Sequence, residues 1–428
     1  MPLSVFNKRH KTFAAIILLS SALILKPAIT SSPPPCLTEY EHTYMGWEEF
    51  RAPIAGTVPA ELRAIGNVVV YQDLLVVPEP DKGVHLIDNA DISAPRKSSF
   101  IPIVGAGQIA VVNDVLLARS YVDLVAIDIS NAEQAIEVGR VENVFPYDDA
   151  PGDNAEGIAS ADQTQGVVID VTRHYSCSSG GSYHDSTSYG GCGGGGSSAS
   201  PAALPDSSSF NVGVAGSMAT MLLVEQHLYV LSQDNVITIS VAEPQAPSLT
   251  NTLNVSLEME TVYYHDNALY IGTRTGVQIL DLTDPAHPQK AGLFQHPRQC
   301  DPVVVSGTVA YSTLRSGSGC GGAQNQLDVL DVSNIQNPTL ITSVEMNEPY
   351  GLAEEGSNLF VADGGAGLKI LDVTDPANPV LTHTYANFPA KDVILNAGHG
   401  VLQGYEHITQ IDYTDLDNII EISRITAD

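Results

Sequence analysis

A short hydrophobic run that ends in a polar, usually acidic, residue and leads into a proline-containing turn recurs seven times along the chain. The best preserved copies are residues 279–288, Ile-Leu-Asp-Leu-Thr-Asp-Pro-Ala-His-Pro, and residues 370–379. The residues that end the seven runs are Asp88, Asp128, Ser240, Asp281, Asp331, Asp372 and Asp412. Their successive spacings are 40, 112, 41, 50, 41 and 40 residues. A period near 40 residues indicates a repeat architecture.

Each unit predicts four short antiparallel strands. In residues 350–363, two apolar stretches flank a Gly-Ser-Asn sequence, and these residue types suit a tight hairpin turn. Two glycines then make a second turn, residues 368–372 alternate as a third strand, and residues 380–385 form a fourth. The first hairpin has an equivalent in every unit, at 65–78, 109–120, 218–231, 260–273, 301–314, 350–363 and 391–404.

Four strands in about 40 residues is the spacing of a propeller blade. One such sheet cannot bury both faces, whereas neighbouring sheets in a ring supply the missing core and leave only short edges. We therefore expect an all-β fold, a seven-bladed β-propeller of four-stranded antiparallel blades over residues 59–425. The competing geometry is a right-handed β-solenoid, which would require shorter repeats and Gly or Asn ladders at every corner.

The recurring phrases resemble the LVIVD repeat family of extracytoplasmic bacterial and archaeal β-propellers. The phrases at 279–288 and 367–379 carry the resemblance, which extends over roughly residues 59–425 because strand, turn and spacing recur together. It implies a propeller outside the cytoplasm. It implies no activity, since the family has no agreed biochemical function.

The charge of the chain is strongly negative. Its 428 residues include 19 Lys and Arg against 49 Asp and Glu, a formal net charge of −30. Such a surface repels nucleic-acid phosphates and anionic headgroups, so we expect no nucleic-acid partner. The acidity is explained by solubility, or by binding of cations or of a cationic partner. A hydrophobic content of 43% is ample for the core of one large domain.

Residues 1–35 are predicted to be a targeting segment. Residues 8–11 are basic, and residues 12–25 form a mostly apolar run that is short for a membrane span but right for a secretory signal. We therefore expect the protein in the periplasm or on the outer cell surface. Loss of residues 1–35, which hold four Lys and Arg and no acidic residue, would take the formal charge from −30 to −34. Residues 36–58 would then be a linker or a cap.

Cys36 is the candidate for lipid attachment. Many proteins that the chain resembles look like lipoproteins with an acylated first cysteine, and Cys36 stands where that residue would stand. The three prolines at 33–35 depart from the small residues that lipoprotein processing prefers. The alternatives are cleavage near residues 28–31, which releases a soluble protein, and retention of residues 12–25 as an anchor. Membrane contact is expected only through that lipid or that uncleaved segment.

The other four cysteines favour two local disulfides. In an oxidising compartment, an odd count of five leaves one cysteine over. Cys177 and Cys192 lie in one insertion, while Cys300 and Cys320 flank the first hairpin of the fifth unit, so we predict the pairs 177–192 and 300–320. Cys36 is then left, which favours the lipid over a free thiol.

The spacing of 112 residues after Asp128 contains an insertion. An ordinary period of 40 leaves 72 additional residues, at about 146–211. We expect the strand at 167–171 to complete the blade begun near Val141, and the Gly/Ser-rich remainder to be a surface loop. Loops on rigid scaffolds often carry function, so this insertion is a candidate binding segment.

Two sets of residues in the insertion have metal-ligand chemistry. His174, Cys177, His184 and Cys192 are zinc-ligand types, but their spacing matches no usual finger and we favour a disulfide with bystander histidines. The acidic residues at 148–153 offer oxygen ligands, yet they lack the spaced Asp-x-Asp-x-Asp order of a calcium loop. We therefore assign no metal and no cofactor, and keep Ca²⁺ as the alternative.

Catalytic motifs are absent from the sequence, which has no Gly-x-Ser-x-Gly and no His-Glu-x-x-His. The recurrent aspartates occur in almost every unit, so we expect each to accept hydrogen bonds from the turn that follows it. Positions that differ between units are better site candidates. The innermost strands should begin around one mouth of the channel, where Glu260, Asp301 and Asp392 would be acidic and Tyr350 would join them. The alternative is a polar, water-filled rim.

The favoured function is a non-enzymatic, secreted or surface-anchored binding module, a monomer that offers its rim and the insertion to a protein or glycan partner in the cell envelope. The alternative is a propeller hydrolase or lyase that uses carboxylates at the channel mouth, which requires an acid and a base with separated pKa values. A purely structural envelope element is a third class. A deep pocket holding the three carboxylates would favour an enzyme, and a shallow rim would favour the binding module.

Overall fold

The computed structural model describes residues 37–147, 158, 160–176, 211–296, 302–316 and 324–427. The chain divides into two compact units. The larger unit comprises Tyr40–Arg173 and Ser186–Asp428 and contains all the blades. The smaller unit comprises Met1–Glu39 and His174–Asp185, and its described residues are the strand ends at 37–39 and 174–176.

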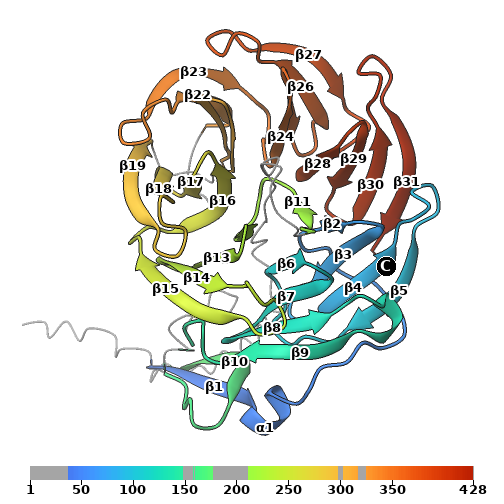
Figure 1. Ribbon diagram of the computed structural model, residues 1–428, viewed down its shortest axis with the longest axis vertical. Helices are drawn as coiled ribbons and strands as arrows, with labels where there is room; N and C mark the ends of the chain where they lie inside the picture. Colours follow the sequence, from blue (N-terminus) through green and yellow to red (C-terminus); the bar gives the residue numbers. More distant parts are fainter. Residues whose placement is uncertain are drawn as a thin grey trace, which may run out of the picture. The chain divides into compact units, whose positions relative to one another are not determined.

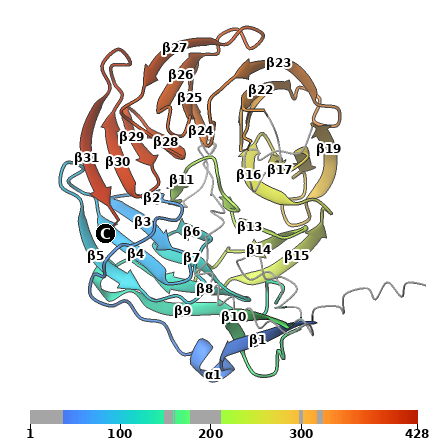
Figure 2. The same ribbon diagram turned by 180° about the vertical axis from the view of Figure 1, so that it is seen from behind.

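Seven antiparallel sheets follow one another in the described part of the larger unit and form a ring of blades (Figure 1). Figure 2 shows the same ring from behind. Within each blade, four strands pair in chain order, and the first strands of successive blades contact one another around the centre. The predicted seven-bladed β-propeller is therefore confirmed.

The strands of blades 1 to 4 are β2 (Val69–Tyr71), β3 (Leu74–Glu79), β4 (Gly83–Asp88) and β5 (Arg96–Ile101); β6 (Ile109–Val112), β7 (Val115–Ser120), β8 (Asp123–Asp128) and β9 (Ile136–Val141); β12 (Met221–Val224), β13 (His227–Ser232), β14 (Asn235–Ser240) and β15 (Ser248–Asn254); β16 (Met259–His265), β17 (Ala268–Thr273), β18 (Gly276–Asp281) and β19 (Gln289–Gln295). Blades 5 to 7 comprise β20 (Val303–Ser306), β21 (Val309–Leu314), β22 (Gln326–Asp331) and β23 (Thr339–Glu345); β24 (Leu352–Glu355), β25 (Asn358–Ala362), β26 (Leu368–Asp372) and β27 (Val380–Tyr385); β28 (Asp392–Asn396), β29 (His399–Gln403), β30 (His407–Asp412) and β31 (Ile420–Thr426).

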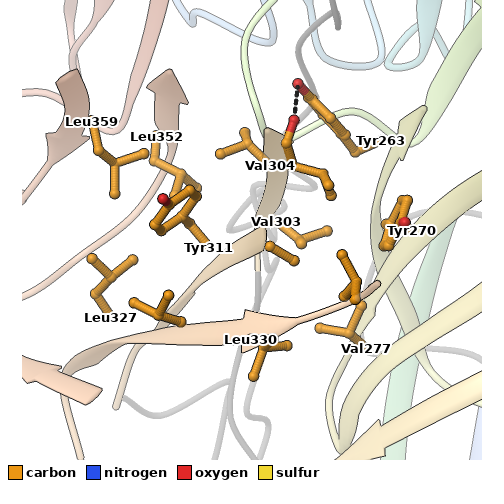
Figure 3. Packing of buried hydrophobic residues seen from close by; sticks show 14 of the residues in the cluster. Tyr263, Tyr270, Val277, Val303, Val304, Tyr311, Leu327, Leu330, Leu352 and Leu359 are labelled. Carbon is orange, nitrogen blue, oxygen red and sulfur yellow. Dashed lines mark hydrogen bonds between the residues drawn. The ribbon is translucent and has the colours of Figure 1, made fainter. Parts of the chain in front are cut away.

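The core lies between neighbouring blades. All six residues of β7 and of β17 are buried, whereas outer strands such as β15 are largely exposed, because a middle strand is covered on both faces and an outer strand is not. Figure 3 shows one of these interfaces, where Tyr263 and Val277 of blade 4 and Leu352 of blade 6 pack around blade 5. The Tyr263 hydroxyl donates a hydrogen bond to the Val305 carbonyl at 3.3 Å. Each blade thus completes the core of its neighbours.

Blades 1 and 7 close the ring. The side-chain amides of Asn89 and Gln410 exchange two hydrogen bonds, with Asn89 Nδ2 to Gln410 Oε1 at 3.0 Å and Gln410 Nε2 to Asn89 Oδ1 at 2.8 Å. Both residues are buried, and one hydrophobic cluster joins Val70 of β2 to Ile394 and Ile408 of blade 7. Residues from the two ends of the repeat array are therefore fixed together by packing and by satisfied polar groups.

In six of the seven blades, the third strand ends in an aspartate that caps the following turn. Its Oδ1 accepts a hydrogen bond from the backbone nitrogen two residues later, as between Asp281 and Thr283 at 2.7 Å; the same contact is made by Asp88, Asp128, Asp331, Asp372 and Asp412. The predicted role of these residues is confirmed. In all seven blades, the pairing of the third and fourth strands also shifts register just before this position, a bulge that bends the outer strand.

The strand at residue 167 does not complete blade 2, contrary to our expectation. Blade 2 already has its fourth strand in β9, and β10 (Val167–Ser176) pairs instead with β1 (Leu37–Met45). We predicted no strand in residues 37–58, so the true partner of β10 was missing from the sequence interpretation. An α-helical turn, α1 (Trp47–Phe50), follows β1, and the short helix η1 (Ala132–Gln134) precedes β9.

The segment after α1 runs along the outer edges of blades 1 and 2. Arg51 forms an ion pair with the fully buried Asp123 at 2.9 Å, and isolated bridges join Ala55 to Ile136 and Thr57 to Phe100. Residues 51–57 thus attach to outer strands β9 and β5. Among the described helices, none is long and apolar enough to cross a membrane.

Candidate binding face

The centre of the ring is occupied by residues 211–217, the segment that follows the insertion. Strand β11 (Val214–Ala215) pairs with β2, inside the ring, and Val212 bridges to Val112 of blade 2 (Figure 1). On the opposite side of the segment, the Ser217 hydroxyl accepts a hydrogen bond from the Leu352 backbone nitrogen at 2.6 Å. Residues 211–217 therefore contact the innermost strands of blades 1, 2 and 6.

Asp392 lies beneath this segment and is only 3% exposed. Its Oδ1 accepts hydrogen bonds from the backbone nitrogens of Ser217 at 3.0 Å and Val393 at 2.9 Å. Burial is the main reason why the pKa of Asp392 is raised to about 8, and the hydrogen bonds from backbone groups oppose that effect. Asp392 thus fixes the central segment and is shielded from solvent.

Two of the three carboxylates expected at the channel mouth, Glu260 and Asp392, lie in the described part of the chain, and their surroundings differ. Glu260 forms an ion pair with Arg274 at 3.0 Å, and Arg274 also binds Glu258 at 2.7 Å. Asp392 is covered as described above, and Asp301 lies outside the described residues.

Tyr350 lies in a cluster of polar and aromatic side chains where blades 5, 6 and 7 meet. Its backbone is fixed at three points: its nitrogen donates to the Ala362 carbonyl at 2.8 Å, its carbonyl accepts from the Thr313 hydroxyl, and the next residue, Gly351, donates to the Lys391 carbonyl at 2.8 Å. Its hydroxyl bonds to the Tyr405 hydroxyl at 2.9 Å and donates to Glu348 Oε1 at 3.1 Å.

Two cations complete this cluster. The Arg315 guanidinium lies 4.1 Å from the centroid of the Tyr350 ring, and Lys391 Nζ lies 4.1 Å from the centroid of the Tyr405 ring. The two rings meet edge to face, with centroids 6.3 Å apart. Burial, and next the nearby Arg315 charge, lower the pKa of Lys391, while Glu348 acts in the opposite direction. We call these five residues, 315, 348, 350, 391 and 405, the tyrosine–cation cluster.

The cluster is placed at the face where every first strand begins. Each of its residues precedes a first strand or follows a second strand, and in an antiparallel blade these positions lie at the same end. Asp363, fully buried and paired with Lys369, accepts hydrogen bonds from the backbone nitrogens of Asn347 and Glu348 and so holds the loop before β24. Tyr405, in contrast, is 47% exposed, which leaves a side chain of the cluster available to a partner.

Of the residues we predicted, only Tyr350 belongs to this cluster. Arg315, Lys391 and Tyr405 were missed, although aligned repeats contain a signal for them. Counting from the first hairpins, Arg315 of blade 5 occupies the position of Arg274 in blade 4 and Tyr405 in blade 7. Arg274 is paired with two glutamates, whereas Arg315 lies over a tyrosine. The signal in the sequence is that the residue type at this position differs between units.

The cavity between the insertion and blade 2 is small. Tyr121, Val122, Tyr147, Val167 and Val168 line it, and its volume of about 10 Å³ suits roughly one water molecule. It does not correspond to a substrate pocket.

The other predicted site residues lie largely outside the described part of the chain. These are Cys36, Cys177, Cys192, Cys300 and Cys320, together with His184 and the acidic residues at 148–153. His174 is described, at the exposed end of β10. Within the described ranges, no group of three or more His, Cys, Asp or Glu is arranged to hold a metal ion.

Comparison with known proteins agrees with the blade structure. The model of the LVIVD repeat matches residues 321–346 and 353–387, which cover the outer half of blade 5 and most of blade 6. The chain carries LVIVD repeats. The resemblance proposed from the sequence is thereby confirmed, and Tyr350 lies in the short loop between the two matched segments. None of the curated proteins compared with the chain matches it.

Several solved structures are similar to this LVIVD-repeat chain. A functionally unknown protein from Desulfotomaculum acetoxidans has 10% identity and a TM-score of 0.50, with 84% of this chain and 95% of that chain covered. BamB from Moraxella catarrhalis has 7% identity and a TM-score of 0.47 (87% and 94% covered). The computationally designed Ika8 protein has 9% identity and a TM-score of 0.48 (83% and 86% covered). Identities this low bear on the fold alone.

Proposed function

We propose that this LVIVD-repeat protein is a non-enzymatic binding module that works outside the cytoplasm and engages a protein or glycan partner of the cell envelope. The observation that carries the proposal is the tyrosine–cation cluster. It combines a half-exposed aromatic ring, hydroxyl groups and two cations on a rigid rim, a combination typical of recognition surfaces.

The setting of the cluster supports binding rather than catalysis. Its backbone is held by hydrogen bonds from three blades, so little order has to be gained when a partner binds. Asp392, a described carboxylate whose pKa is raised to about 8, is buried against the central segment and cannot meet a substrate without displacing it. The basic and apolar residues at 8–25 support export, with Cys36 as the proposed lipid attachment point.

A pull-down from the native envelope tests this function. The intact protein should capture a partner that Tyr405→Ala loses, because that change removes the exposed ring of the cluster. Leu249→Ala, which truncates a side chain of similar exposure (50%) on the outer strand of blade 3, is the matched control and should retain the partner. A version lacking residues 172–203 separates the insertion from the cluster. If only this deletion loses the partner, the face assigned here is wrong.

A further inference from the structure

The pairing of Arg315 with Lys391 is unusual for so acidic a chain. The formal net charge is −30, yet these two cations come close enough for the charge of Arg315 to lower the pKa of Lys391. Among the described residues, no carboxylate lies within ion-pair distance of either. Two half-buried like charges repel each other, so their proximity has an electrostatic cost in the absence of a bound anion.

The comparison with blade 4 sharpens this point. Arg274 occupies the position equivalent to Arg315, and its guanidinium is neutralised by Glu258 and Glu260 at 2.7 and 3.0 Å. The carboxylate of the cluster is that of Glu348. It accepts a hydrogen bond from the Tyr350 hydroxyl. Among the residues of the cluster, all of which the structure describes, one carboxylate therefore accompanies two cations.

The structure also provides groups that suit a sugar. The exposed Tyr405 ring offers an apolar surface for the C–H face of a pyranose, and the two tyrosine hydroxyls and Glu348 offer hydrogen bonds to its hydroxyl groups. A guanidinium that lies over a ring still has its in-plane N–H groups, which match a carboxylate or phosphate in bidentate geometry. An acidic peptide would neutralise the two cations but would not supply a flat C–H face to pack against the Tyr405 ring.

We propose that Arg315 and Lys391 together bind the anionic group of an acidic saccharide, either the carboxylate of a uronic acid or a phosphate ester. The inference rests on the proposed function, since it names the ligand class of the same face. The remaining members of the cluster bind the sugar itself: Tyr405 contacts its apolar side, and Tyr350 and Glu348 bind hydroxyls.

Calorimetric titration of the full chain tests the ligand class. The probes are trigalacturonate, glucose 6-phosphate, neutral maltotriose and triglutamate. One of the two anionic saccharides should bind at least about tenfold more tightly than maltotriose and triglutamate, and the better one identifies the source of the charge. Equal affinity for maltotriose, equal affinity for triglutamate, or no binding of either anionic saccharide at millimolar concentration would overturn the proposal.

Variants assign the binding to the two cations. Arg315→Gln and Lys391→Met keep most of each side chain and remove its charge. Each should lower the affinity for the anionic saccharide by about tenfold or more. Arg274→Gln, at the equivalent position in blade 4, is the matched control and should bind as the wild type does. A comparable loss in Arg274→Gln would show a general charge effect and reject the assigned site. Thermal melting of all three variants verifies their folding.

The two proposals fail in different ways. If Tyr405→Ala abolishes capture of the envelope partner while Arg315→Gln and Lys391→Met retain it, the binding face stands and the anionic ligand class is wrong. If Tyr405→Ala captures the partner normally, the face itself is wrong, whatever the titrations show.

Discussion

The carboxylate of Asp392 accepts a hydrogen bond from the backbone nitrogen of Ser217 at 3.0 Å, although 175 positions separate the two residues. Asp392 begins the innermost strand of blade 7, and Ser217 ends the segment that occupies the centre of the ring. The contact joins the central segment to the last blade. It also turns a residue that we expected at an open, acidic mouth into a buried structural group.

This burial predicts a dependence of stability on pH. Because the pKa of Asp392 is raised from 3.8 to about 8, the folded protein holds a proton between about pH 4 and pH 8 that the unfolded chain has released. The free energy of unfolding should therefore fall as pH rises through this window, by up to about 1.4 kcal/mol per pH unit from this group. Above about pH 8 its contribution should level off.

Urea unfolding of the wild type and Asp392→Asn across pH 4–9 measures the effect. The amide does not titrate, so the stability advantage of the wild type over the variant should shrink steadily up to about pH 8. A constant difference at every pH would show that Asp392 titrates alike in both states.

The close approach of the central segment predicts that Gly216 cannot be enlarged. A Cβ added there would lie 2.0 Å from Asp392 Oδ2, so the segment would have to move. We expect Gly216→Ala to lower the free energy of unfolding by about 1–3 kcal/mol, as overpacking does. Gly365→Ala, where an added Cβ has no neighbour within 4 Å, is the control. If both variants melt like the wild type, the segment is not packed in the channel.

Ring closure depends on the buried amide pair of Asn89 and Gln410. Gln410→Ala leaves the Asn89 side chain without its partner, and we expect it to lower the free energy of unfolding by about 1–3 kcal/mol. The exposed Gln289→Ala on an outer strand should change stability little. Denaturant unfolding of both variants makes the comparison, and equal midpoints would contradict the closure described here.

The capped turns should show a lowered carboxyl pKa. Hydrogen bonds from the hydroxyl and backbone nitrogen of Thr283, at 2.6 and 2.7 Å, hold the pKa of Asp281 below its ordinary value. This interaction stabilises the fold above about pH 4 and is lost as pH falls through the lowered pKa. Thr283→Val should raise the pKa of Asp281 in an NMR titration, whereas Thr283→Ser should leave it low. An unchanged value in Thr283→Val would contradict the role of the hydroxyl.

The sequence was sufficient to predict the blades because every unit repeats the same pattern of strands and turns. The spacing of Asp281, Asp331 and Asp372, the turn residues and the strand alternation all agree, and each depends on interactions within one blade. The capping role of these aspartates could be predicted for the same reason, since both partners lie two residues apart.

Contacts between segments that are distant in the sequence could not be predicted from these local patterns. Nothing in the local pattern around Val214 indicates a strand at the centre of the ring, and nothing around residue 167 indicates pairing with β1. Of the site, Tyr350 was found because its position varies between repeats. Arg315, Lys391 and Tyr405 come from three different loops, and only the packing of blades 5, 6 and 7 against one another places them beside Tyr350.

Hydrogen–deuterium exchange of the full chain, with and without the partner captured from the envelope, tests most directly which face binds. We predict that the partner slows amide exchange at residues 347–351, 391–393 and 403–406, around the tyrosine–cation cluster. Slower exchange confined to the turns after the capping aspartates, such as 282–288, would place binding on the opposite end of the blades and contradict the account.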